Sequence, residues 1–287
     1  MTTENDYKWL IPSCSFSESL QDEKATWDEA YKNPHERFSL LIDPDFCKKL
    51  ILASNESHSC DIPDSPEVKV LIPGCGSEIY LQKTLLEFCP NIGQIYSTDF
   101  STTAVEEAQQ RWQEVNGDAR INSQQIIFEE ADSTRLTEQN PDWQEKFDYV
   151  IVVGSVLSSD DARNRQMIRE FYKVLKPGGK LYGSFPSILA DLELAYLNQS
   201  YAHWLTDGSI NLPASAREYG GNHREIYYTP LRLNRIFKEA GFKRLNFELF
   251  FGDSDILINQ VKEKAGLDDP DLCYWEFLVR LEKQALG

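Results

Sequence analysis

The central part of the chain alternates short apolar runs with amphipathic stretches. The runs at 68–73, 94–99, 124–132 and 147–154 have the length of buried strands, and the stretches between them carry apolar residues at helical spacing. Strands that alternate with helices of this length are typical of a parallel sheet covered by helices on both faces. The pattern therefore predicts an α/β fold with a Rossmann-like arrangement.

A long insertion follows the next predicted strand, at 180–185. Residues 187–228 are rich in Tyr, Ser and Asn, and they are too many for an ordinary connection between a strand and a helix. Their last part, 217–228, combines two glycines with acidic and aromatic side chains. A loop of this composition can close over a ligand and exclude water, so we expect the insertion to be a lid.

Regular elements return after the insertion. Thr229 at the cap, Pro230 at the first position and Gly241 beyond the end predict a helix. The apolar runs at 242–251 and 273–283 resemble an antiparallel final pair of strands, with a short helix between them.

The first 66 residues precede the alternating part and predict a helical extension. Residues 17–32 have a helical pattern, and a second helix is expected to begin near Pro44. The polar, Pro-containing stretch at 55–66 predicts a linker into the main domain at 67–287.

The charge balance restricts the partners of this chain. Lys and Arg total 29 and Asp and Glu total 46, a formal net charge of −17. Such a surface repels phosphate backbones, whose neutralisation normally drives nucleic-acid binding, so we expect no nucleic-acid partner. The same acidic surface attracts cationic molecules.

Composition also bounds the compartment. No run approaches the ~18–20 consecutive apolar residues of a membrane span, and the N-terminal residues lack the pattern of a secretory signal. We therefore expect a cytoplasmic protein with no membrane partner. The cysteines are scattered without CxxC or metal-ligand spacing, which predicts reduced thiols and no metal site. They are Cys14, Cys47, Cys60, Cys75, Cys89 and Cys273.

A glycine pair marks a candidate binding loop. Gly74 and Gly76 follow a predicted buried strand and precede a predicted helix, where the backbone must turn tightly and approach a ligand closely. Glu78 stands where a third glycine would continue the pattern, and its charge disfavours a pyrophosphate but tolerates a cationic ligand. The alternative is a tight turn that binds nothing.

Two aspartates end the next two predicted strands. Asp99 lies near the ~20-residue offset from the glycine loop at which an acid reaches ribose hydroxyls. Asp132 ends the third strand, where its carboxylate could accept a hydrogen bond from the exocyclic amine of adenine. Each aspartate alone could be a simple cap. Together with the glycine loop they occupy one edge of the predicted sheet, where ligands of open α/β sheets bind.

A series of short motifs runs through these strand ends: VLIPGCGSE at 70–78, STDFS at 97–101, EEADSTRL at 129–136, FDYVIVVGSVL at 147–157 and YKVLKPGGKLYGS at 172–184. In this series the chain resembles class I S-adenosylmethionine (SAM)-dependent methyltransferases. The resemblance implies a seven-stranded sheet with an antiparallel last strand, SAM as the cofactor, and S-adenosylhomocysteine as the product.

The resemblance also implies roles for the residues at the first two strand ends. Gly74, Cys75 and Gly76 would line the methionine part of SAM, Asp99 would hold the ribose, and Phe100 would pack on the adenine.

At the next strand ends, Ala131 and Asp132 would bind the adenine edge, and Gly154 and Ser155 would lie beneath the reacting methyl group. The chain departs from the family at Ile72, where many members carry an acid, and at Glu78 in the place of the third glycine.

A narrower similarity involves the segment before the main domain. Trp27 to Tyr31, the PGCG of the loop and the Asp99-Phe-Ser triplet resemble methyltransferase-like proteins that modify protein lysines, and PGCG also resembles thiopurine methyltransferases. The signature of the lysine modifiers after the fourth strand is absent from VVGSVLSSDD, which disfavours a protein substrate.

The catalytic candidates, Tyr219 and His223, lie in the predicted lid. His223 is the candidate general base, although a loop histidine can also be merely solvated. Glu218 and Tyr227 are candidate substrate residues.

Trp27 and Tyr31, one helical turn apart, could also contact the substrate by capping the SAM site, or could simply anchor their helix.

These observations favour methyl transfer to a small molecule, at nitrogen or oxygen. The acidic composition and the aromatic and acidic lid favour an amine. The alternatives are a protein-lysine methyltransferase, a catalytically silent SAM-binding partner subunit, and a nicotinamide-dependent oxidoreductase.

Overall fold

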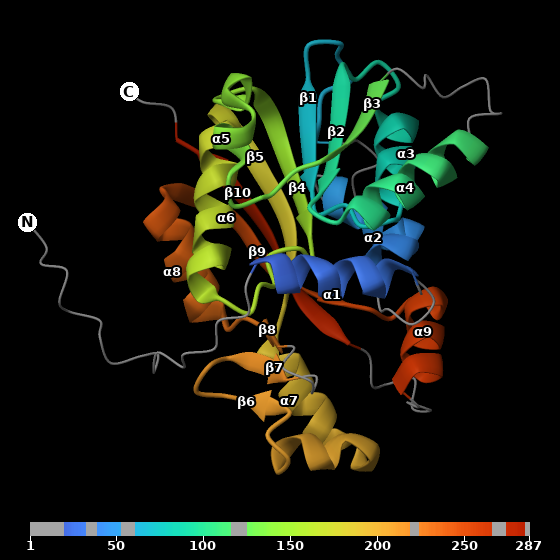
Figure 1. Cartoon of the computed structure of the whole chain (residues 1–287), viewed down its shortest axis with the longest axis vertical. Coiled ribbons are helices and arrows are strands. Elements are labelled where there is room, and N and C mark those ends of the chain that lie inside the picture. Colours follow the sequence, from blue (N-terminus) through green and yellow to red (C-terminus); the bar gives the residue numbers. More distant parts are fainter. Residues whose placement is uncertain are drawn as a thin grey trace, which may run out of the picture.

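A seven-stranded sheet forms the centre of the computed structural model (Figure 1). The structure describes residues 20–32, 39–52, 61–115, 125–218, 224–265 and 274–284. The strands of the sheet, in spatial order, are β3 (Ile126–Glu130), β2 (Gln94–Asp99), β1 (Lys69–Pro73), β4 (Phe147–Val153), β5 (Leu175–Pro186), β10 (Trp275–Lys283) and β9 (Phe242–Phe251).

The strand directions confirm the predicted topology. The pairs β3–β2, β2–β1, β1–β4 and β4–β5 are parallel, whereas β10 runs antiparallel to both β5 and β9. The strand order reverses between β1 and β4, and such a reversal places a ligand crevice outside the carboxyl ends of those two strands.

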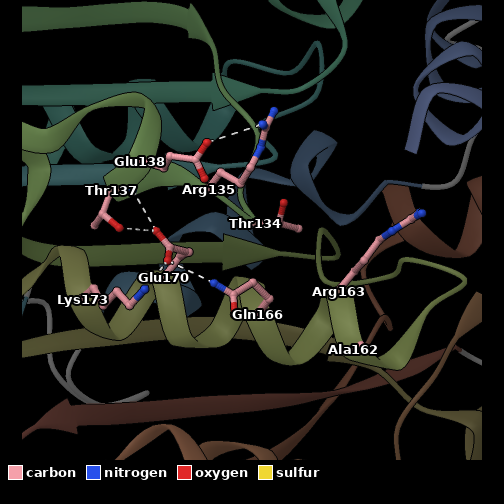
Figure 2. A pocket seen from close by; sticks show the side chains of 9 residues that line it. All are labelled: Thr134, Arg135, Thr137, Glu138, Ala162, Arg163, Gln166, Glu170 and Lys173. Carbon is pink, nitrogen blue, oxygen red and sulfur yellow. Dashed lines mark hydrogen bonds and ion pairs between the residues drawn. The ribbon is translucent and has the colours of Figure 1, made fainter. Parts of the chain in front are cut away.

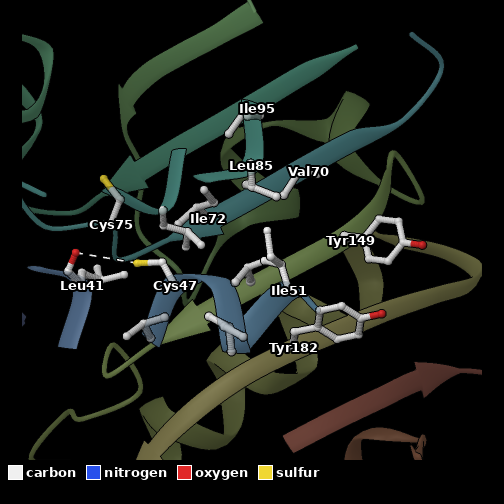
Figure 3. Packing of buried hydrophobic residues seen from close by; sticks show 14 of the residues in the cluster. Leu41, Cys47, Ile51, Val70, Ile72, Cys75, Leu85, Ile95, Tyr149 and Tyr182 are labelled. Carbon is white, nitrogen blue, oxygen red and sulfur yellow. Dashed lines mark hydrogen bonds between the residues drawn. The ribbon is translucent and has the colours of Figure 1, made fainter. Parts of the chain in front are cut away.

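Helices cover both faces of the sheet. On one face, α2 (Pro44–Ile51), α3 (Tyr80–Phe88), α4 (Thr102–Val115) and α9 (Asp255–Ala265) contribute to one apolar cluster. On the other face, α5 (Leu136–Gln139), α6 (Asp161–Val174) and α8 (Pro230–Ala240) contribute to a second one. Figure 3 shows Cys47 and Ile51 of α2 packed against Val70 and Ile72 of β1. The described residues 40–51 and Ile62 therefore contribute to the core of the sheet.

Local cap chemistry sets several helix ends where the sequence predicted them. Asp43 precedes Pro44 and caps α2, since its carboxylate accepts a hydrogen bond from the Asp45 N–H. At the start of α4, Ser101 Oγ accepts a hydrogen bond from the Ala104 N–H. The hydroxyl of Thr229 caps the start of α8, and Gly241, the C-cap residue after its end, has a left-handed φ of 97°. The predicted start of α2 and both predicted ends of α8 are confirmed.

The insertion at 187–228 contains regular elements in place of the long loop that its composition predicted. Its elements are α7 (Ile188–Leu197), the 3₁₀ segment η5 (Gln199–Leu205), β6 (Ile210–Asn211), β7 (Ala216–Glu218) and β8 (Arg224–Ile226). The three strands form a small antiparallel sheet. Helix α7 is capped by Ser187 and buries Ile188, Leu194 and Ala195. The loop prediction at 217–228 missed the strands because their pairing is tertiary.

Helix α1 (Leu20–Lys32) lies across the carboxyl ends of the central strands, and the insertion lies beyond the same edge (Figure 1). Among the described residues, no helix combines the length and apolar character needed to cross a membrane. Cys47, Cys75 and Cys89 are buried with free thiols. Within the described ranges, no group of three or more His, Cys, Asp or Glu side chains is arranged to hold a metal ion.

Candidate active site

The glycine loop turns directly after β1. Gly74 and Gly76 have φ values of 65° and 60°, in the left-handed region that favours glycine. A Cβ atom on Gly74 would lie 2.2 Å from the Cβ of Ser155, so the loop and the segment after β4 approach too closely for a side chain. The Cys75 N–H donates to the Thr98 carbonyl at 2.9 Å. The two glycines are therefore required by this backbone path.

Asp99 joins the glycine loop to the start of α4. Its Oδ2 accepts a hydrogen bond from the Gly76 N–H at 3.0 Å, and its Oδ1 accepts one from the Ser101 N–H at 2.9 Å. Its carbonyl accepts the Ala131 N–H at 2.9 Å. The residue is 3% exposed. The structure thus brings together three of the predicted cofactor residues, Gly76, Asp99 and Ala131.

Asp132 has partners for both carboxylate oxygens. Oδ1 accepts from the backbone N–H and the hydroxyl of Thr134, at 2.8 and 2.7 Å, and Oδ2 pairs with Arg135 Nε at 3.2 Å. These contacts are those of a turn cap. Each carboxylate oxygen can accept more than one hydrogen bond, so the role of Asp132 at the adenine edge stays a prediction, as does the packing of the half-buried Phe100 on adenine.

Gly154 has open space beside it. Its φ is 52°, and a Cβ atom built on it would meet no atom within 4 Å. The neighbouring Ser155 donates from its hydroxyl to the Pro73 carbonyl at 3.1 Å, which ties the end of β4 to the end of β1. A ligand group can therefore approach the backbone of Gly154 next to the glycine loop. This space fits the expected position of the reacting methyl group of SAM.

Glu78, the acid in the place of a third glycine, forms an ion pair that the sequence did not reveal. Arg111 of α4 pairs with Glu78 at 2.9 Å, and the same guanidinium nitrogen donates to the Ser77 carbonyl at 3.1 Å. The acid in the place of a third glycine is thus held by a cation from the following helix.

Helix α1 is fastened to the ends of β2 and β3 and to the first turn of α6 by charged contacts. Asp28 accepts a hydrogen bond from Ser101 Oγ at 2.5 Å. Lys24 pairs with Glu130 at 2.5 Å, and Glu23 pairs with Arg163 at 2.6 Å. Sequence reasoning missed these contacts because they join residues more than 70 positions apart.

Tyr31 of α1 lies next to the glycine loop, and Trp27 lies beside it. The rings of Trp27 and Tyr31 are 6.2 Å apart. Tyr31 is buried, and its hydroxyl lies 2.9 Å from the position of a Cβ atom on Gly76. The Tyr31 ring therefore covers the glycine loop. A contact of either residue with substrate stays a prediction.

The small sheet of the insertion holds the segment that follows β4. The guanidinium of Arg224 on β8 donates to the Ser159 carbonyl at 3.2 and 3.3 Å, and Tyr228 Oη donates to the Val156 carbonyl at 2.7 Å. Tyr227 is buried, and its hydroxyl donates to Glu225 at 3.3 Å. These contacts place the insertion next to the expected methyl position.

The remaining candidates of the insertion are less well defined. Glu218 is half-buried on β7 and accepts a hydrogen bond from Asn211 at 3.3 Å. Tyr219 and His223, the catalytic candidates, lie outside the described residues. Their roles stay predictions.

Four buried charged side chains also lie in this region and were not predicted. We call Asp191, Arg217, Glu225 and Glu276 the buried charge cluster. Arg217 Nε lies 3.4 Å from Asp191 Oδ2. Arg217 and Glu225 are direct partners in the β7–β8 register. Burial raises the pKa of Asp191 and that of Glu276 to about 7.

A polar hollow of about 590 Å³ adjoins the adenine side of the site, between α5 and α6 (Figure 2). Arg135, in its lining, pairs with both Asp132 and Glu138, and Glu170 accepts two hydrogen bonds from Thr137. These side chains bind one another, so they stabilise the segment after β3. We therefore do not assign a ligand to the hollow. Its full lining is Thr134, Arg135, Thr137, Glu138, Ala162, Arg163, Gln166, Glu170 and Lys173.

The fold is shared with solved structures of low sequence identity. A SAM-dependent methyltransferase from Methanosarcina mazei is 14% identical, with a TM-score of 0.54 over 78% of this chain and 95% of that one. The [4+2]-cyclase SpnF is 17% identical, with a TM-score of 0.59 over 96% of this chain and 99% of its own. Magnesium protoporphyrin IX methyltransferase from Synechocystis PCC 6803, with bound S-adenosylhomocysteine, is 14% identical, with a TM-score of 0.50 over 93% and 89%.

The sequence itself matches the family described as a methyltransferase domain, over residues 70–179, from β1 into β5. A comparison with curated proteins gave no match. The family match, the fold and the geometry of the strand ends agree. The methyltransferase domain at residues 70–179, together with the shared fold, supports a SAM-dependent methyltransferase, whose cofactor is SAM.

Proposed function

We propose that this enzyme transfers the methyl group of SAM to a nitrogen or oxygen atom of a small molecule, with an amine as the favoured acceptor. The observation that carries this proposal is the double cover of the carboxyl edge. Helix α1 is fastened to the ends of β2 and β3 and to the first turn of α6, and Arg224 and Tyr228 of the insertion hold the segment after β4. An edge covered from two sides suits a small acceptor better than a polypeptide segment.

Bound SAM supplies a methyl carbon that is already activated by a sulfonium, so the protein mainly orients the reactants and excludes water. In this proposal Asp99 holds the ribose, and its contacts with the Gly76 and Ser101 N–H groups support that role by fixing the glycine loop. Gly154 leaves room for the acceptor to approach. Trp27 and Tyr31 on α1 keep water from the cofactor side.

A base is needed only if the acceptor arrives protonated. His223 is the proposed base, and Tyr219, Glu218 and Tyr227 are the proposed contacts of the acceptor from the insertion. The net charge of −17 supports an amine because it attracts cations to the enzyme.

The test is a transfer assay with SAM that carries a labelled methyl group. The full chain is incubated with a mixture of small amines and alcohols, and separately with intact polypeptides. We expect label in the small-molecule fraction. Label found only in polypeptide would show a protein methyltransferase, and SAM binding without transfer to any acceptor would show a catalytically silent subunit.

A further inference from the structure

The buried charge cluster gathers four ionisable side chains from three parts of the chain. Asp191 comes from α7, Arg217 and Glu225 face each other across β7 and β8, and Glu276 lies at the start of β10. Their exposed fractions are 5%, 6%, 8% and 6%. Charged residues at this degree of burial are rare unless opposite charges accompany them.

The cluster carries more acid than base. It holds three carboxylates and the single guanidinium of Arg217, whose central carbon lies 3.5 Å from the centre of the Trp204 ring. Arg224, the other nearby cation on these strands, adjoins Glu225 and so points to the opposite face of β8, where it binds the Ser159 carbonyl. Within the described part of the cluster, one guanidinium therefore accompanies three buried carboxylates.

A carboxylate oxygen of the cluster also lacks a hydrogen bond. Asp191 Oδ2 is fully buried and, among the described residues, accepts no hydrogen bond; its ion pair with Arg217 Nε is 3.4 Å long. A buried carboxylate oxygen without a hydrogen-bond donor is costly. A cationic donor would satisfy it and would also offset the excess of acid.

The cluster adjoins the expected methyl position. Glu276 accepts a hydrogen bond from Ser184 Oγ, and the carbonyl of the same serine accepts the Gly154 N–H at 3.2 Å. A single residue thus connects the cluster to the glycine beside which the structure leaves open space.

We infer that the buried charge cluster is the acceptor-binding subsite, and that it binds a protonated amine or guanidine group of a small-molecule substrate. Asp191 and Glu276 receive the cation, and Arg217 holds Asp191 and Glu225 in place. This inference rests on the proposed function and adds to it the chemical class of the acceptor. It requires a cationic group on the acceptor but does not require that group to be the one methylated.

Calorimetric titration of the full chain saturated with S-adenosylhomocysteine tests this assignment. The probes are three matched pairs: tyramine and tyrosol, putrescine and 1,4-butanediol, and ethanolamine and ethylene glycol. In each pair hydroxyls replace the ammonium groups, of which putrescine has two and the other two amines have one each. We expect at least one amine to bind tenfold or more tightly than its alcohol, and Asp191→Asn and Glu276→Gln each to lower that affinity tenfold or more.

The matched control is Asp142→Asn, which neutralises an exposed aspartate just before β4, at the opposite end of the sheet. It should leave amine affinity unchanged, and every variant should bind S-adenosylhomocysteine like the wild type, which verifies the fold. If neither cluster variant folds, the difference in wild-type affinity between the amines and the alcohols decides whether the assignment holds. The assignment is overturned if alcohols bind as tightly as amines, if none of the six probes binds, or if the cluster variants keep full amine affinity.

The failure of the subsite and the failure of the proposed function give different results. Amine binding that depends on Asp191, without transfer of label to any acceptor, would keep the subsite and refute the function. Transfer of label to acceptors that carry no cation, unchanged in Asp191→Asn, would keep the function and refute the subsite.

Discussion

Replacement of Gly74 by alanine tests whether the path of the glycine loop is fixed as described. The backbone φ of 65° costs an alanine roughly 1–2 kcal/mol. The new Cβ would also lie 2.2 Å from Ser155 Cβ, a contact that neighbouring atoms must relieve by moving. Overpacking of this kind costs about 1–3 kcal/mol. We therefore expect Gly74→Ala to lower the free energy of unfolding by roughly 2–5 kcal/mol.

Gly178→Ala is the matched control, because Gly178 has a φ of 79° but no atom within 4 Å of its Cβ position. It should show the backbone cost alone. Urea unfolding of both variants measures the difference, and calorimetry with S-adenosylhomocysteine measures the cofactor site. Ser155→Gly in the Gly74→Ala background should recover part of the lost stability. Equal unfolding free energies for the two alanine variants, with cofactor affinity intact in both, would refute this account of the loop.

Three further predictions concern the cover, the methyl position and the buried charge cluster. Asp28→Ala removes the contact of α1 with Ser101, so S-adenosylhomocysteine should dissociate about 5- to 30-fold faster in stopped-flow experiments, whereas an unchanged rate would mean that α1 is not a cover. Gly154→Ala should cost only about 1–2 kcal/mol of stability in urea unfolding but should abolish methyl transfer, because its Cβ enters the open space; full activity would place the acceptor elsewhere. The pKa of Asp191 is raised to about 7 in the folded chain, so without a ligand its ionisation should lower stability as the pH rises from about 4 to 7, by up to about 1.4 kcal/mol per pH unit. Asp191→Asn should flatten that slope in urea unfolding between pH 5 and 7.5, and an unchanged slope would contradict the raised pKa.

The parts of the fold that depend on local chemistry were predictable from the sequence. The ends of α8 follow from the cap hydroxyl of Thr229, the fixed φ of Pro230 and the left-handed φ that Gly241 allows. The structure places the helix between these residues. Asp99 could be placed at the binding edge because parallel strands of alternating α/β units end on the same side of a sheet.

The rest depends on contacts between residues that are far apart in the sequence. The bond of Asp28 to Ser101 and the pairing of Glu78 with Arg111 leave no local pattern. The strands β6, β7 and β8 have two or three residues each, too few for an apolar alternation to be visible. The sequence consequently suggested a loop at 217–228, and the partnership of Arg217 with Glu225 could not be foreseen.

The central claim is that SAM binds at the edge formed by the glycine loop and Asp99, under α1. Calorimetric titration of the wild type and of Asp99→Asn with S-adenosylhomocysteine tests it most directly. The account predicts one bound molecule per chain for the wild type, and an affinity about 10- to 100-fold lower for Asp99→Asn, because the variant loses charge-assisted hydrogen bonds to the ribose. Absence of binding to the wild type, or equal affinity of a folded Asp99→Asn variant, would contradict the account.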